Sequence, residues 1–245
     1  MTMALTSKRK NNNEYYGYAS VRGQSHVATK TPNQDAVKIR KTQYGITLVV
    51  ADGVGSHKYS QIGSRTIVKS VTDAFYMFES GQIPVTDITA TAYKLFKKRV
   101  PKSKNTQSST TCIFAHISEK HGLFVGQVGD GACYIELNDT FTTLKGKESE
   151  FANLVVPLNP SLESAEWHTR HFKADKEAKL RILLATDGVS NDIIPEKENQ
   201  CLEHYCNEVK KIDAFGRNRF VRKTLKHWDV PGSSDDKTMI VYSRG

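Results

Sequence analysis

The chain has 245 residues, of which 38% are hydrophobic and 25% charged, as is usual for a soluble globular protein. No apolar run approaches the roughly 20 residues that a membrane-spanning helix needs, and the start of the chain lacks the charge order of a signal peptide. These properties argue against membrane insertion and export. We expect a cytoplasmic protein with a flexible polar arm at residues 1–14 and a single domain at residues 15–245.

The formal net charge is +9, and basic residues concentrate in residues 93–105 and 210–226. Such an excess is compatible with nucleic acid, an anionic membrane surface or an acidic partner, but solvated helix faces explain it more often. No zinc finger, basic zipper or RNA-binding strand motif occurs, so no nucleic-acid partner is expected. The four cysteines form no CxxC pair, which favours buried thiols in a reducing compartment.

Short β-branched runs alternate with three segments of helical periodicity along the chain. In chain order the pattern predicts strands at 15–21 and 45–51, helices at 64–79 and 86–99, strands at 109–117, 122–129, 132–137 and 181–186, a helical region at 199–227 broken near Gly216, and a strand at 237–243. Strands and helices that cluster in this way favour an α+β fold of antiparallel sheets with helices packed outside. Residues 144–172 show weak periodicity and two prolines, which predicts an irregular insertion beside a site.

Acidic residues stand where several predicted strands begin or end. Two interior strands end in the same Asp-Gly pair, at Asp52 in "VVADGVGSHK" and at Asp187 in "RILLATDGVSNDI". Three other motifs place acids at such ends: "TPNQDAV" with Asp35, "VGDGACYI" with Asp130 and "GSSDDKTMIVY" with Asp235 followed by Asp236. A single Asp-Gly is usually only a turn. Sheets, however, gather strand ends in space, so these carboxylates can converge.

A convergent set of carboxylates suits hard divalent cations. Mg²⁺ and Mn²⁺ prefer carboxylate, carbonyl and water oxygens, and the cations offset the repulsion among the acids. Two such ions roughly 4 Å apart can share a carboxylate and a hydroxide, an arrangement common in phosphoryl transfer. The sparse histidines argue against a histidine-rich zinc centre.

Six motifs in one order, "NQDA", "VVADGVGS", "SSTT", "VGDG", "LLATDGVS" and "SSDDKTMIV", resemble the type 2C metal-dependent serine/threonine protein phosphatases, most of all the compact bacterial-type members. The resemblance spans roughly residues 17–243. It implies an αββα sandwich of two antiparallel sheets flanked by helix pairs, with a flap at about residues 145–172. It also implies hydrolysis of phosphoserine and phosphothreonine in proteins by a hydroxide that bridges two divalent metal ions, Mn²⁺ or Mg²⁺.

The resemblance carries specific roles to residues of this chain. Asp52 is implied to bridge the two metals, and Asp130 matches a weaker third metal position shared with Asp187. The implied ligands and catalytic residues of the two-metal site are Asp52, the Gly53 carbonyl, Asp187, Asp235, and Asp35 acting through metal-bound water. Phosphorylated proteins, the products of a serine/threonine kinase, are the implied partners.

The sequence departs from the family pattern around the substrate. Lys30 stands where many members carry a phosphate-gripping arginine; it keeps the charge but loses the bidentate fork, and Arg22 is an alternative phosphate ligand. Val54 stands where many eukaryotic members have a histidine that protonates the leaving group, and His57 lies three residues on. His57 and His26 are each either functional or plain loop histidines. Gln34 replaces a glutamate often found beside the first aspartate.

Two other classes of function stay open at this level. The fold can serve as an inactive binding or regulatory module, although the intact Asp52, Asp187 and Asp235 weigh against this. A metal-dependent nuclease would use the basic surface, but the order of the six motifs does not predict one.

Overall fold

The structure, a computed structural model, describes residues 14–146 and 157–245. Its strands form two five-stranded antiparallel sheets. The first sheet has the order β1 (Glu14–Val21), β10 (Lys237–Arg244), β9 (Leu180–Ala185), β6 (Ala132–Leu137), β7 (Thr140–Lys145). The second has the order β2 (Ala36–Lys41), β3 (Gly45–Ala51), β4 (Cys112–Ser118), β5 (Gly122–Val128), β8 (His168–Phe172).

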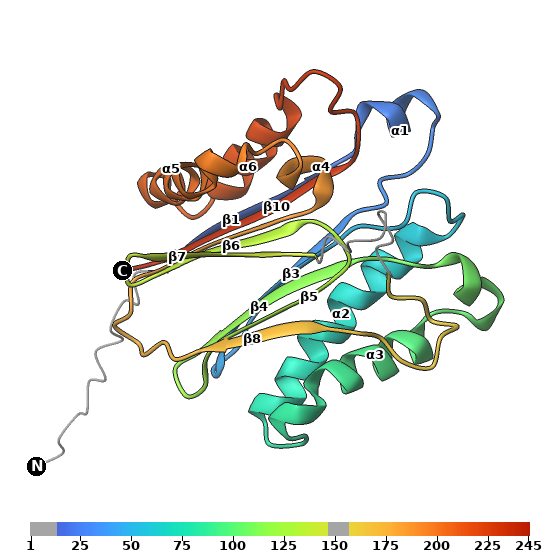
Figure 1. Cartoon of the computed structure of the whole chain (residues 1–245), viewed down its shortest axis with the longest axis horizontal. Helices are drawn as coiled ribbons and strands as arrows, with labels where there is room; N and C mark the ends of the chain where they lie inside the picture. Colours follow the sequence, from blue (N-terminus) through green and yellow to red (C-terminus); the bar gives the residue numbers. More distant parts are fainter. Residues whose placement is uncertain (1–13, 147–156) are drawn as a thin grey trace, which may run out of the picture.

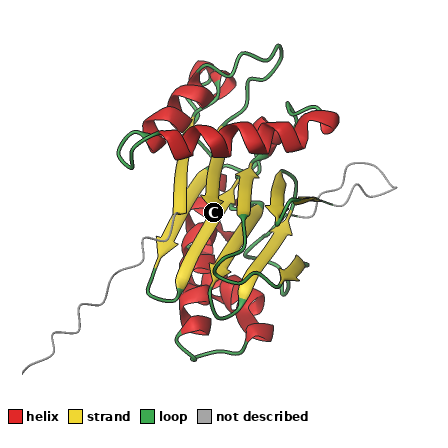
Figure 2. Cartoon of the chain, turned by 90° about the vertical axis from the view of Figure 1, so that its left-hand side faces the viewer, coloured by secondary structure: helices red, strands yellow, loops and turns green. Residues whose placement is uncertain are grey.

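Helices cover both outer faces, so the molecule has four layers (Figure 1). The helices α2 (Ser60–Glu79) and α3 (Ile88–Arg99) pack on the second sheet, whereas α5 (Glu198–Lys211) and α6 (Arg217–Lys226) pack on the first. Two short helices, α1 (Gln24–Ala28) and α4 (Asp187–Ser190), lie at one end of the sheets. Figure 2, seen toward the opposite end, shows the strands between the two helical layers. The predicted αββα sandwich is confirmed.

Three apolar clusters hold the layers together. The central cluster fills the space between the sheets with alternate side chains of their strands, such as Leu48, Ile113, Ile182 and Ile240. The other two clusters join each sheet to its helices, and Phe75 of α2 lies at the centre of one of them. Because β3, β4 and β9 are buried on both faces, their sequences are largely apolar, whereas β10, also buried, keeps an apolar centre between polar ends.

Three strands, β2, β7 and β8, were not predicted from the sequence, and all three are edge strands. Each is partly exposed and rich in polar residues, as in "TFTTLK" of β7 and "HTRHF" of β8, so no apolar run marks it. The segment expected to be irregular therefore ends in a strand that pairs with β5. The rest of that segment lies partly outside the described residues, as does the expected N-terminal arm, although Glu14 already belongs to β1.

All four cysteines are free, and Cys112, Cys133 and Cys206 are buried, in line with the sequence prediction. Burial raises the pKa of the Cys201 thiol to about 11 and that of the Cys206 thiol to about 12, so neither is a nucleophile at neutral pH. Among the described helices, none combines the length and apolar character that crossing a membrane requires.

Candidate metal centre

The acidic motifs meet at the end of the sandwich that carries α1 and α4 (Figure 1). Asp52 follows β3, and Asp187 follows β9 as the first residue of α4. Asp35 precedes β2, Asp235 precedes β10, and Asp130 lies between β5 and β6. Since neighbouring strands are antiparallel, a strand that ends at this edge lies beside one that begins there, which is why acids far apart in sequence come together.

Three of these acids form a compact cluster. Carboxylate oxygens of Asp52, Asp130 and Asp187 lie within 4.8 Å of one another. Asp235 lies outside this trio and is exposed, but its charge raises the pKa of both Asp52 and Asp187. The grouping places Asp130, for which the resemblance implied a third metal position shared with Asp187, beside Asp187 and Asp52.

Asp35 lies in the interior beside the trio, with 4% of its surface exposed. Its Oδ2 accepts a hydrogen bond of 2.8 Å from Thr186 Oγ1, whereas its Oδ1 is buried and has no partner among the described residues. Burial raises the pKa of Asp35 to about 6, and the negative charge of Asp236 acts in the same direction. An unpartnered buried carboxylate oxygen needs a donor or a cation, so Asp35 fits a role as an acceptor for metal-bound water.

The remaining carboxylates are hard to ionise together. Burial, and then the charges of Asp130, Asp235 and Asp35, raise the pKa of Asp187 to about 7. The pKa of Asp52 is raised well above its usual range by burial and by the charge of Asp35. Burial also raises the pKa of Asp130. Charges this close cannot all be carried without compensation, so the cluster either holds protons or binds cations.

The turn that presents Asp52 is fixed by the segment just before β4 and by the loop before β2. The Asp52 carbonyl accepts hydrogen bonds of 2.7 Å from Thr110 Oγ1 and the Thr111 N–H, and its own N–H donates to Thr111 Oγ1. The Gly53 N–H donates to the Gln34 carbonyl, and a Cβ at Gly53 would lie only 2.7 Å from the backbone of Ser60. The two threonines of the "SSTT" motif therefore position Asp52 by hydrogen bonds to its main-chain N–H and carbonyl groups.

Glycines also shape the turns that present Asp130 and Asp187. Asp130 stands between Gly129 and Gly131, whose φ angles of 91° and 88° are strained for any residue with a Cβ. A Cβ at Gly188 would lie 2.0 Å from the Asp236 carbonyl oxygen, so only glycine lets α4 approach the chain before β10. Both Asp-Gly pairs and the Gly-Asp-Gly therefore serve as tight corners that bring carboxylates together.

Asp236 has a role that the sequence did not reveal. It is 1% exposed, and its carboxylate accepts the Gly23 N–H at 2.7 Å and the Gln34 N–H at 2.6 Å. His26, which lies in α1, has its Nδ1 2.9 Å from Asp236 Oδ2. The carboxylate thus ties the start of β10 to both ends of the loop that leads from β1 to Asp35. The sequence signal was the second acid of "SSDD", but its partners lie more than 200 residues away.

The candidate substrate residues lie in the same region but outside the acidic cluster. Lys30 is exposed, with a positive φ of 58°, and no ion pair of the described chain includes it. Arg22 is exposed and donates to the Thr31 carbonyl at 3.4 Å, within its own loop. His57 is half-buried, and its Nδ1 accepts the Ser109 N–H at 3.4 Å. None of the three contacts an acid of the cluster in the described structure.

The described part of the predicted flap attaches beside the cluster. Thr110 forms isolated bridges to both Gly53 and Leu158, and the Leu158 N–H donates to the Thr110 carbonyl at 2.8 Å. Farther along, Tyr93 of α3 donates to the carbonyls of Asn159 and Leu162. Residues 157–162 are therefore held between the Asp52 turn and α3.

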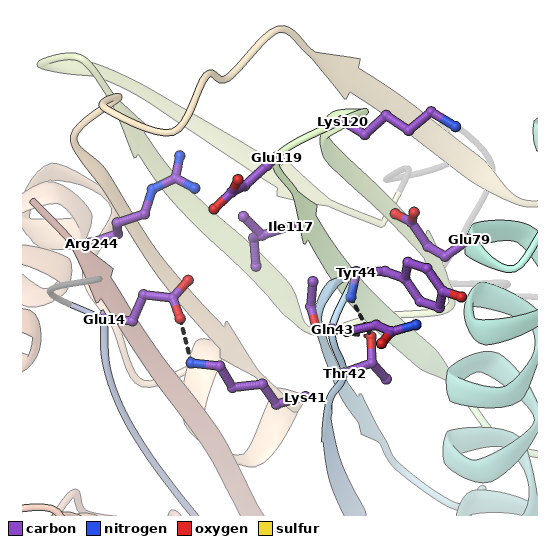
Figure 3. A pocket seen from close by; sticks show the side chains of 11 residues that line it. Glu14, Lys41, Thr42, Gln43, Tyr44, Glu79, Ile117, Glu119, Lys120 and Arg244 are labelled. Atoms are coloured by element: carbon purple, nitrogen blue, oxygen red, sulfur yellow. Dashed lines mark hydrogen bonds and ion pairs between the residues drawn. The ribbon is translucent and has the colours of Figure 1, made fainter. Parts of the chain in front are cut away.

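The opposite end of the sandwich also carries acids, but these are paired with bases, as Figure 3 shows for Glu14 and Lys41. Glu14 lies 2.6 Å from Lys41, and the buried Glu79 carboxylate lies 2.8 Å from His116 Nε2. Glu14, Lys41 and Glu79 border a cavity of about 330 Å³ whose wall also includes Arg244. The donor set here is mixed in charge, so it lacks the excess of carboxylates that a divalent cation needs.

The sequence matches the family model of protein phosphatase 2C over residues 22–228, and the chain belongs to this family. Among curated proteins, no match was found. Many solved structures share the fold.

Three solved structures cover nearly the whole chain. The catalytic domain of the serine/threonine protein phosphatase PstP, in complex with two manganese ions, is 18% identical with a TM-score of 0.59, over 94% of this chain and 97% of that one. PppA, a regulatory component of T6SS in Pseudomonas aeruginosa, is 16% identical with a TM-score of 0.65, over 95% and 98%. RsbX in complex with magnesium is 14% identical with a TM-score of 0.55, over 95% and 96%.

Proposed function

We propose that this protein is a cytoplasmic, metal-dependent phosphatase that hydrolyses phosphoserine and phosphothreonine in proteins. The observation that carries the proposal is the convergence of Asp52, Asp130 and Asp187 within 4.8 Å at one end of a protein phosphatase 2C fold. Manganese and magnesium in similar structures support the choice of metal. Phosphorylated proteins are the proposed substrates, with no nucleic-acid partner and no membrane insertion.

The donor set fits two divalent cations. Asp52, the Gly53 carbonyl, Asp187 and Asp235 would hold them, Asp35 would act through water, and Asp130 with Asp187 offers a third site. When bound, the ions lower the pKa of water held between them toward roughly 7 and offset the charge of the phosphoryl group. The raised pKa values of Asp35 and Asp187 support this assignment, because nearby cations remove the repulsion that causes part of the shift.

Other residues of the chain position the substrate and the acids. Thr186 orients Asp35, and Asp236 holds the loop that carries Lys30, which offers an exposed cation to the substrate phosphate. His57 is the nearest histidine in sequence to the Asp52 turn, and because its Nδ1 accepts the Ser109 N–H, its neutral ring carries the proton on Nε2. In this tautomer the Nε2–H is able to donate a hydrogen bond to a leaving-group oxygen, whereas transfer of a proton requires the imidazolium form.

The test measures hydrolysis of p-nitrophenyl phosphate and of a phosphothreonine peptide with Mn²⁺, with Mg²⁺ and with chelator. We expect hydrolysis of both substrates with metal and none with chelator. Activity in chelator that equals activity in Mn²⁺ contradicts the two-metal site. No activity with any metal favours the inactive binding module, and cleavage of DNA or RNA but not of the phosphopeptide favours a nuclease.

A further inference from the structure

Helix α6 carries an unusual concentration of positive charge. Its sequence, "RNRFVRKTLK", contains five basic residues and no acid. Arg217 has a structural role, because it donates to the carbonyls of Val209 and Ile212 and lies over the Tyr15 ring. The other four are exposed and take part in no ion pair among residues 14–146 and 157–245: Arg219, Arg222, Lys223 and Lys226.

Helix stability does not explain this pattern. Arg219 lies in the first turn, where the helix dipole disfavours a positive charge and where the helix itself has no acid; the nearby Asp213 carboxylate accepts the N–H groups of Phe215 and Gly216 instead. Arg219 also stands three and four residues before Arg222 and Lys223, and such like-charge pairs destabilise a helix by a few tenths of a kcal/mol each. The uncompensated charges therefore weaken α6, and an external anion would relieve their repulsion.

An aromatic cleft opens beside these charges. A cavity of about 540 Å³ lies between α5 and α6, and Tyr205, Phe220 and Trp228 form its aromatic lining. Lys223 and His227 add basic groups to its wall, and Asp229 is the acid among its lining residues. An apolar hollow with a basic rim suits a chain segment that is acidic and carries one large apolar side chain.

Ring stacking and hydrogen bonds connect the wall of the cleft to the acidic end of the sandwich. Trp228 stacks on Tyr205, and its Nε1–H donates to Asp192 Oδ2 at 2.8 Å. The same carboxylate oxygen accepts the hydroxyl of Ser233. Asp192 follows Asp187 by five residues, so the cleft is fixed to the segments that present the metal-site acids. A preformed cleft loses little entropy when a partner binds.

We propose that the aromatic cleft and the basic face of α6 form a docking surface for an acidic protein segment with an aromatic anchor residue. Charge complementarity selects the acidic segment, and the hollow selects a side chain that enters it. The apolar lining is concave, whereas insertion into a membrane uses protruding apolar groups. Among the described residues next to α6, Phe215, which is 96% exposed, is the one that protrudes in this way. Whether binding depends on Phe215 therefore distinguishes a membrane from an acidic protein segment.

The test uses a fluorescein-labelled peptide in which one Trp is flanked by Glu and Asp residues, with binding followed by fluorescence anisotropy in low salt. We expect saturable binding that weakens as salt rises. The double reversal Arg222→Glu/Lys223→Glu weakens it about tenfold or more, since two attractive charges become repulsive. The matched control Lys94→Glu/Lys98→Glu makes the same change of net charge on α3 and leaves binding within about twofold.

A second variant tests the hollow itself. Thr224 lines the cavity, so Thr224→Phe should fill the hollow and weaken binding, as should replacing the peptide's Trp by Ser. Circular dichroism establishes that each variant is folded. The proposal is overturned by absent binding to the wild-type chain, by equal loss in the α3 control, or by binding that survives both Thr224→Phe and loss of the anchor.

A membrane partner gives a different result. Vesicles of phosphatidylserine and phosphatidylcholine that bind the chain in a Phe215-dependent way, while the peptide does not bind, would assign the surface to lipid and overturn the proposal. The binding assay contains neither metal nor phosphate ester. Its outcome is therefore separate from that of the phosphatase assay.

Discussion

At one end of the sandwich acidic side chains lie beside one another, and at the other end they lie beside bases. Asp52, Asp130 and Asp187 form no ion pair with any described residue, whereas Glu14 pairs with Lys41 and Glu79 with His116. The two ends are built from the same strands, so the difference does not come from the fold. It indicates that the paired acids stabilise the folded chain, while the unpaired ones are kept for a ligand.

The largest expected difference between the ends is in catalysis. Asp187→Asn removes one charge from the proposed metal shell and should lower the rate of phosphate-ester hydrolysis on the order of a hundredfold or more. Glu14→Gln, a matched acid-to-amide change at the opposite end, should leave the rate within about twofold. Steady-state kinetics with Mn²⁺ measures both. Equal losses in the two variants would mean that the contrast between the ends has no catalytic meaning.

Stability without metal should change in opposite directions at the two ends. Asp187→Asn removes repulsion in the cluster and should raise the free energy of unfolding by about 1–2 kcal/mol at pH 8, where the wild-type group is forced to ionise. Glu79→Leu leaves His116 Nε2 without its Glu79 partner and should lower the free energy of unfolding by about 1–3 kcal/mol. Urea unfolding in chelator gives both values. If Asp187→Asn is destabilising, the acids of the cluster do not repel one another as proposed.

The pH dependence of the metal-free protein should also reveal the acidic end. The folded-state pKa is raised to about 6 for Asp35 and about 7 for Asp187, so the folded state holds more protons than the unfolded state between about pH 4 and 7. Stability should therefore fall as the pH rises through this window. Thermal melts in chelator should show the fall in the wild type and a shallower one in Asp187→Asn. Saturating Mn²⁺ should flatten the profile and raise the melting temperature.

The smallest effect concerns the exposed lysine near the acidic end. Lys30→Ala should raise KM for a phosphopeptide about fivefold and change kcat less, since an exposed charge contributes about 1 kcal/mol to binding. Lys41→Ala, which removes a paired lysine at the opposite end, should leave KM unchanged. Unchanged KM in Lys30→Ala would point to Arg22 instead.

The sequence predicted the buried strands and the acids at their ends, because a buried strand contains a short apolar run and an Asp-Gly turn is recognisable from two adjacent residues. It missed β2, β7 and β8, because an edge strand needs polar, exposed positions that also suit a loop. It also missed Asp236, since the two N–H groups that this carboxylate accepts come from Gly23 and Gln34, and no local pattern records so distant a contact. The resemblance implied a weaker third metal position for Asp130, shared with Asp187, and this assignment stays a prediction.

The position of β10 between β1 and β9 has a consequence for synthesis on the ribosome. Until β10 emerges, β1 has no neighbour in its sheet, and neither Asp235 nor the Asp236 clamp exists. Such a long-range pairing slows folding and leaves two strand edges open to aggregation. A nascent chain that stops before residue 235 thus lacks Asp235 and Asp236, and the acidic end is completed only when the last residues of the chain have been made.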